Sequence, residues 1–156
     1  MADSSYITKT VEPFLISWAG NELGETLFRL REKLGMGTSG TSVSFEFDGV
    51  NEARTVGVLA SASKSMKSGA VRKLIADAAI LLASPFKKKV LVFAYQLVRT
   101  NFENQFRGIL DLERIEFMVH PELPECMQRK LEEIHTLARN EQLSKKEKTK
   151  ASRNRR

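Results

Sequence analysis

A length of 156 residues, with 42% hydrophobic and 28% charged residues, is typical of one soluble domain that buries its own core. The single cysteine, Cys126, excludes an internal disulfide, and we expect its side chain to be a small buried hydrophobe. The N-terminal residues are polar, and no apolar run approaches the roughly 20 residues that span a bilayer. The sequence therefore predicts a cytoplasmic protein with no membrane partner.

The formal net charge of +6 is concentrated at the C-terminal end of the sequence. Residues 145–156 hold seven Lys or Arg and one Glu, and the remaining 18 basic and 18 acidic residues cancel over residues 1–144. A segment of this composition is typically disordered, and it either contacts a polyanion or serves only solubility. We predict an N-terminal arm over residues 1–10, one α/β domain over residues 11–143 and a basic, disordered tail over residues 144–156.

The first predicted elements are a long helix and two strands. Apolar residues recur at steps of three to five over residues 11–34, which predicts a helix, although Gly20 and Gly24 weaken its middle. Residues 43–47 alternate between apolar and polar side chains, which predicts a half-buried strand that ends near Asp48. Residues 55–62 are apolar without alternation, which suits a strand that is covered on both faces.

The second half of the sequence alternates between helices and strands. A helix is expected from Ser68 to Pro85, where the proline ends it, and a buried strand over residues 90–95. A short helix near residues 102–110, a strand over 115–119 and a helix over 125–143 follow. This order predicts an α/β fold in which a mixed central sheet has helices on both faces.

Few patterns in the sequence point to chemistry. No glycine-rich phosphate loop precedes a helix, and His120 and His135 lack partners at zinc spacing. Glu46 and Asp48 are two residues apart, so they share a strand face and are candidate ligands for a hard divalent cation. The alternative is that Glu46 faces water and Asp48 begins a turn with Gly49.

The segments FDGV, TVGVLASASKSMKSGAVRKLIADAAILL and KKVLVF occur in the order strand, strand, helix, strand. With the preceding GNELGETLFRL, this order resembles the core of the restriction-endonuclease-like, or PD-(D/E)xK, superfamily, and a small uncharacterised group within it. The resemblance implies that Asp48 binds a catalytic Mg²⁺ and that Glu25, or else Glu22, is the acid of the first helix. The family's Glu-x-Lys pair then falls on Leu59 and Ser61, which lack the required carboxylate and ammonium groups.

Two explanations follow from this departure from the family pattern. Either the site has decayed, or it has migrated, with Lys64 or Lys67 and Glu46 or Glu25 replacing the lost groups. We favour decay, and therefore expect a protein that has no enzymatic activity and needs no cofactor. We expect this protein to bind DNA or RNA through a set of basic side chains: Lys64, Lys67, Arg72, Lys73, Lys87, Lys88 and Lys89.

The runner-up is a divergent Mg²⁺-dependent endonuclease, in which Asp48, Glu25 and Lys64 are catalytic and Asp48 and Glu46 bind the metal. A third hypothesis is a non-enzymatic interaction module that forms a homodimer.

Overall fold

The computed structural model describes residues 4–153. A short π-helical segment, η1 (Ile7–Val11), leads into the first α-helix. The further elements follow in the order α1 (Glu12–Leu23), β1 (Leu27–Met36), β2 (Ser42–Asn51), β3 (Val56–Ser61), α2 (Ser68–Ala83), β4 (Lys88–Phe93), α3 (Gln96–Phe106), η2 (Leu112–Arg114), β5 (Glu116–Val119) and α4 (Glu125–Arg153).

The five strands form one mixed sheet in the order β1-β2-β3-β4-β5. Strands β1, β2 and β3 are antiparallel neighbours, and β3, β4 and β5 run parallel. Helix α2 connects β3 to β4, and α3 connects β4 to β5, as parallel strands require. The predicted α/β class and mixed sheet are confirmed.

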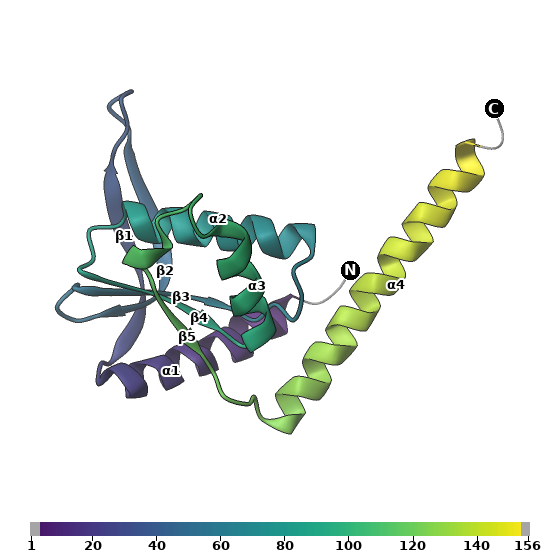
Figure 1. The fold of residues 1–156 in the computed structure, drawn as a ribbon, viewed down its shortest axis with the longest axis horizontal. Coiled ribbons are helices and arrows are strands. Elements are labelled where there is room, and N and C mark those ends of the chain that lie inside the picture. Colours follow the sequence, from purple (N-terminus) through teal and green to yellow (C-terminus); the bar gives the residue numbers. More distant parts are fainter. Residues whose placement is uncertain (1–3, 154–156) are drawn as a thin grey trace.

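The sheet separates two hydrophobic layers (Figure 1). On one face, Leu15 and Ile16 of α1 pack against Val58 and Ala60 of β3. On the other face, α2 and α3 cover the alternate residues of the same strands, including Leu59. Every residue of β3 is buried, as its run of apolar residues predicted, and Ser61 at its end is its polar side chain.

The long helix predicted over residues 11–34 is wrong. Helix α1 ends at Leu23, where Gly24 takes a left-handed conformation with φ of 68° that other residues rarely adopt, and β1 begins at Leu27. Leu27 packs in the layer of α1, whereas Leu30 packs in the layer of α2. A strand that contacts both layers loses the simple alternation of apolar residues, and its leucine spacing then imitates a helix.

Strands β2 and β3 pair over only two residue pairs, Gly49 with Val58 and Val50 with Gly57. Beyond this point β2 continues with β1 as a hairpin that projects from the body of the protein, while β3 continues beside β4 (Figure 1). The two strands therefore separate at Asp48 and leave a fork in the sheet. Side chains from neighbouring elements can enter at this fork.

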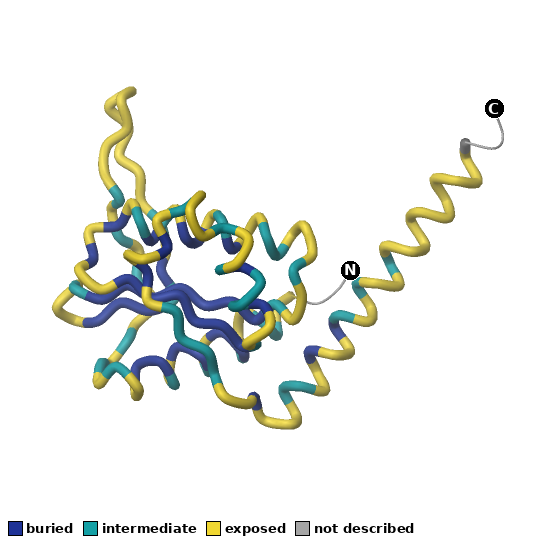
Figure 2. The backbone as a smooth tube through the Cα atoms, viewed as in Figure 1, coloured by how far each residue is buried: buried dark blue, intermediate teal, exposed yellow. Residues whose placement is uncertain are grey.

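Helix α4 begins against the body and then extends away from it (Figures 1 and 2). Leu131 and Ile134 near its start are buried, whereas the residues beyond Glu141 that the structure describes are exposed. Residues 144–153, which we predicted to be disordered, are helical, and residues 154–156 lie outside the described residues. Cys126 is exposed, so the prediction of a buried thiol is wrong. Within residues 4–153, no helix is both long and apolar enough to cross a membrane.

Candidate functional site

An irregularity in β2 directs Asp48 towards α1. Phe28 of β1 pairs with Val50 of β2, and Leu30 pairs with Phe47. One residue separates the two positions on β1 and two residues separate them on β2, so β2 contains one extra residue here. Phe47 and Val50 pack in the layer of α2, while Gly49 lies against Ile16 of α1. Bulges of this kind redirect side chains and are common beside functional sites. Here the bulge places the Asp48 carboxylate in the fork between β2 and β3.

The backbone of Ala60 is the centre of the fork. The amide of Ala60 donates a hydrogen bond of 2.9 Å to the side chain of Asp48, at Oδ2, in place of a backbone carbonyl of β2. The carbonyl of Ala60 accepts a hydrogen bond of 3.0 Å from Lys73 Nζ, which reaches it from α2. Lys73 Nζ also lies 2.7 Å from Asp77 Oδ2, one helical turn further along. The strand edge that β2 leaves unpaired is thus closed by one acidic and one basic side chain.

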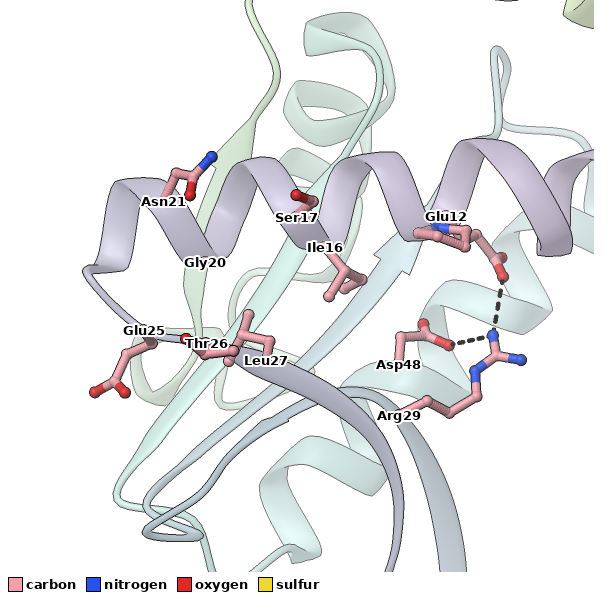
Figure 3. Close-up of a pocket in the computed structure, with 11 residues that line it drawn as sticks. Glu12, Ile16, Ser17, Gly20, Asn21, Glu25, Thr26, Leu27, Arg29 and Asp48 are labelled. Carbon is pink, nitrogen blue, oxygen red and sulfur yellow. Dashed lines mark hydrogen bonds and ion pairs between the residues drawn. The ribbon is translucent and has the colours of Figure 1, made fainter.

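Glu12 and Arg29 complete the cluster (Figure 3). Glu12 is in the first turn of α1, and its side chain is 10% exposed. The guanidinium of Arg29, on β1, points between two carboxylates, with Nη2 3.9 Å from Glu12 Oε2 and 3.5 Å from Asp48 Oδ1. These are loose contacts, longer than the 2.7–2.9 Å of a strong charge-assisted hydrogen bond.

Burial and like charge perturb the ionisable groups of this cluster. Burial, with the neighbouring Asp48 carboxylate as a second cause, raises the pKa of Glu12. Burial also raises the pKa of Asp77, against the opposing effect of Lys73. Burial alone would lower the pKa of Lys73, but Asp77 and the other two carboxylates outweigh it and raise that pKa. Lys73 is therefore charged at neutral pH, and the cluster contains more acid groups than cations.

A hollow of about 320 Å³ opens beside this cluster, between α1 and the bulge of β2. Glu12, Arg29 and Asp48 line one end of it, and Ser17, Asn21 and Glu25 line the other (Figure 3). Perturbed titratable groups beside a concave surface are the usual mark of a functional site. We therefore take this hollow and its charged end as the candidate site.

The face of β3 that meets the cluster differs from the sequence prediction. Val58 and Ala60 pack in the layer of α1, whereas Leu59 packs in the layer of α2. Ser61 follows the same alternation as Leu59. The face of β3 that meets Asp48 therefore carries Val58 and Ala60, and not the predicted Leu59 and Ser61. Neither Val58 nor Ala60 offers a carboxylate or an ammonium group.

The other predicted catalytic residues lie apart from Asp48. Glu25 follows α1, points away from Glu12 in Figure 3, and accepts a hydrogen bond of 3.2 Å from the buried Asn51. Glu46 is half exposed and touches the cluster only through Arg29, at 3.5 Å. Lys64 is paired with Glu132 of α4. The acid of α1 that lies beside Asp48 is Glu12, and the lysine that contacts Ala60 is Lys73; the sequence predicts neither as a catalytic residue.

The predicted nucleic-acid-binding side chains do not form one patch. Lys64 and Lys67 lie in the loop after β3, whereas Lys87, Lys88 and Lys89 lie at the opposite end of the sheet, before and at the start of β4. Lys89 is buried and donates to the carbonyl of Leu82, and Lys88 pairs with Glu116. Of the remaining two, Arg72 is exposed on α2 and Lys73 belongs to the cluster described above. The charges near the loop and those near β4 are therefore separate surfaces.

No group of three or more His, Cys, Asp or Glu side chains within residues 4–153 is arranged to hold a metal ion. Comparison of the chain with protein-family models, with curated proteins and with solved structures gives no match. The functional conclusion therefore depends on the geometry of the site itself.

Proposed function

We propose that this protein is a Mg²⁺-dependent nuclease of the restriction-endonuclease-like class whose lysine comes from a helix. The observation that supports this most is the convergence of Glu12, Asp48 and Lys73 at the fork where β2 leaves β3. The order β2-β3-α2-β4 supports the proposal, because the resemblance rests on the order strand, strand, helix, strand over the same segments. The fork provides an acid from the first helix, an acid from the second strand and a lysine beside the third strand.

The residues present fit a magnesium ion with few protein ligands. Mg²⁺ commonly keeps several waters and uses one or two carboxylates together with substrate phosphates, so a cage of three protein ligands is not required. Glu12 and Asp48 are the two carboxylates that would hold it. Burial, with Asp48 as a second cause, raises the pKa of Glu12, and a cation beside the two carboxylates would oppose that shift. When bound, the ion would polarise a phosphodiester oxygen and offset the charge that develops on it.

Lys73 is suited to stabilise charge and unsuited to abstract a proton. Its raised pKa keeps the ammonium group protonated at neutral pH. The ammonium group is held beside the carbonyl of Ala60, and the Lys73 side chain as a whole is 46% exposed. We expect Lys73 to donate to a phosphate oxygen and to orient the phosphodiester against Asp48.

A second candidate function rests on Arg29. Its guanidinium lies between the same two carboxylates that would bind Mg²⁺. If it stays there, the protein is a degenerate nuclease that binds nucleic acid without cleaving it. The two functions differ in whether Mg²⁺ displaces Arg29.

The test is cleavage of supercoiled plasmid and of labelled single strands, with Mg²⁺ or Mn²⁺ present. We expect metal-dependent cleavage that falls at least about 100-fold in Asp48→Asn, Glu12→Gln and Lys73→Met. The matched control is Glu46→Gln, which removes an acid that also contacts Arg29 and should leave cleavage unchanged.

The variant Arg29→Gln distinguishes the two candidate functions. Removal of the guanidinium should lower the Mg²⁺ concentration needed for half-maximal cleavage, because the ion no longer competes with a fixed cation. Absence of cleavage and of Mg²⁺ binding in both the wild type and Arg29→Gln would overturn the nuclease proposal in favour of the degenerate protein.

A further inference from the structure

A second hollow, separate from the candidate site, lies between α4 and the loop that follows β3. It has a volume of about 290 Å³ and is lined by Lys67, Arg139, Gln142, Leu143 and Lys146. Lys64 of the same loop pairs with Glu132 of α4, so the loop and the helix are neighbours here. His135 of α4 is also near this loop, since burial, with Lys64 and Lys67 as further causes, lowers its pKa. Loop and helix together form one basic surface.

Among the residues that the structure describes, the cations of this hollow have no acidic partner. No ion pair within residues 4–153 involves Lys67, Arg139 or Lys146, and no carboxylate lines the hollow. Nearer the start of α4, by contrast, Arg129 pairs with Glu125 and Lys130 pairs with Glu133. Three unpaired cations around one hollow repel one another, and an anion placed between them removes that repulsion.

The helix continues this basic surface beyond the body of the protein. Lys145, Lys146, Lys148 and Lys150 are exposed along α4, with Glu147 among them. A helix that projects without packing is marginal in water, so this segment gains most from a partner of opposite charge. At about 1.5 Å per residue, residues 139–150 extend for roughly 18 Å, which matches about five base steps of duplex DNA at about 3.4 Å each.

We propose that the hollow between Lys67 and α4, with the exposed basic residues that follow it, binds the phosphodiester backbone of a nucleic acid. The choice of nucleic acid as the polyanion rests on the proposed function. The loop that bears Lys67 follows β3 directly, and Ala60 of β3 contacts both Asp48 and Lys73. A nucleic-acid strand that is bound by this surface would therefore lie at the same end of the sheet as the candidate site. Contacts to phosphate alone give binding without sequence preference.

The test is fluorescence anisotropy of a labelled 20-base-pair duplex and a labelled 20-nucleotide strand, with the full chain and EDTA present so that no cleavage occurs. The triple variant Lys67→Gln/Arg139→Gln/Lys146→Gln is compared with Lys33→Gln/Arg107→Gln/Arg114→Gln, which removes the same charge from exposed positions elsewhere. We expect the first variant to weaken binding about tenfold or more at 0.1 M salt. The slope of log affinity against log salt should become shallower by about 2 to 3, since each lost phosphate contact contributes about 0.9. The control variant should retain most of the wild-type affinity and slope.

Equal losses in the two triple variants would overturn the inference, because binding would then follow net charge alone. Binding that occurs only to vesicles containing phosphatidylserine, with none to either oligonucleotide, would overturn it as well. A different result would overturn the proposed nuclease function without overturning this binding surface. If Asp48→Asn and the wild type bind equally well and neither cleaves, the nuclease proposal is lost and the binding surface stands.

Discussion

Ala60 contributes to the candidate site through its backbone amide and carbonyl, and not through its side chain. Both of its backbone hydrogen-bonding groups on the β2 side are satisfied by side chains, the amide by Asp48 and the carbonyl by Lys73. A buried strand edge with unpaired groups would be costly, so these contacts stabilise the fork as well as arranging the site. The same two side chains therefore serve both the fold and the chemistry that we propose.

Lys73 should accordingly contribute to stability. In Lys73→Met, the buried Asp77 carboxylate loses its partner and the Ala60 carbonyl loses its donor, so the free energy of unfolding should fall by about 1 to 3 kcal/mol. Urea denaturation at pH 7 measures this. The double variant Lys73→Met/Asp77→Asn removes both charges and should recover part of the loss. A double variant that is less stable than the sum of the single changes would contradict the pairing.

Glu12 should make the protein less stable as the pH rises. Its pKa is raised by burial and by Asp48, so the folded state binds its proton more tightly than the unfolded state does. The free energy of unfolding therefore falls as the pH rises from the ordinary value of 4.5 through the raised one. Glu12→Gln removes this dependence and should be more stable than the wild type by about 0.5 to 2 kcal/mol at pH 7. Urea denaturation of both proteins at pH 4 and pH 7 checks it, and an equal difference at the two pH values would be the contrary result.

The site could be predicted from sequence only in part. Asp48 stands in a clear alternating strand, so its role as a candidate ligand was accessible. The role of Glu12 could not be predicted from the sequence, because its proximity to Asp48 depends on how α1 crosses the sheet and on the bulge in β2. The sequence places Lys73 in the predicted nucleic-acid-binding set, as one of several basic residues between Lys64 and Lys89, and only the structure reveals its contact with Ala60.

At the scale of elements, β3 depends on close packing at Gly57. A Cβ atom added there would lie 2.1 Å from Cδ2 of the buried Phe86 ring. Gly57→Ala should therefore lower the free energy of unfolding by about 1 to 3 kcal/mol through overpacking. Gly69→Ala is the matched control, since it lies in the first turn of α2 with nothing within 4 Å of the new atom. It should be neutral or stabilising by up to about 1 kcal/mol. Thermal denaturation of the two variants compares them, and equal melting temperatures would refute the packing at Gly57.

Elements were predictable where one pattern dominated. The unbroken apolar run predicted β3, because this strand is buried on both faces, and the helical period predicted α2, because this helix buries one face. The prediction of helix over residues 24–34 is wrong, since Leu27 and Leu30 of β1 pack against different layers. Tertiary packing thus replaced the period of two that a strand normally shows.

For the whole molecule, the described residues divide into a packed body and a projecting helix. Leu131 is fully buried in the layer of α1, so the start of α4 belongs to the body. The part of α4 after Leu143 is exposed throughout the side chains that the structure describes (Figure 2). The body provides the fork and its charged cluster, and the projecting part provides the basic surface.

This division predicts that the basic end of α4 can be removed without lowering the stability of the body. Deletion of residues 144–156 should leave the free energy of unfolding within about 0.5 kcal/mol of the full chain, because no buried side chain is lost from the described part. Leu131→Ala, in contrast, should lower it by about 2 to 5 kcal/mol, because it opens a cavity in the core. Urea denaturation followed by tryptophan fluorescence reports on the body through Trp18, which packs against that same core. A truncation that destabilises as strongly as Leu131→Ala would mean that the projecting helix packs on the body, and the polyanion surface proposed on α4 would then need to be reconsidered.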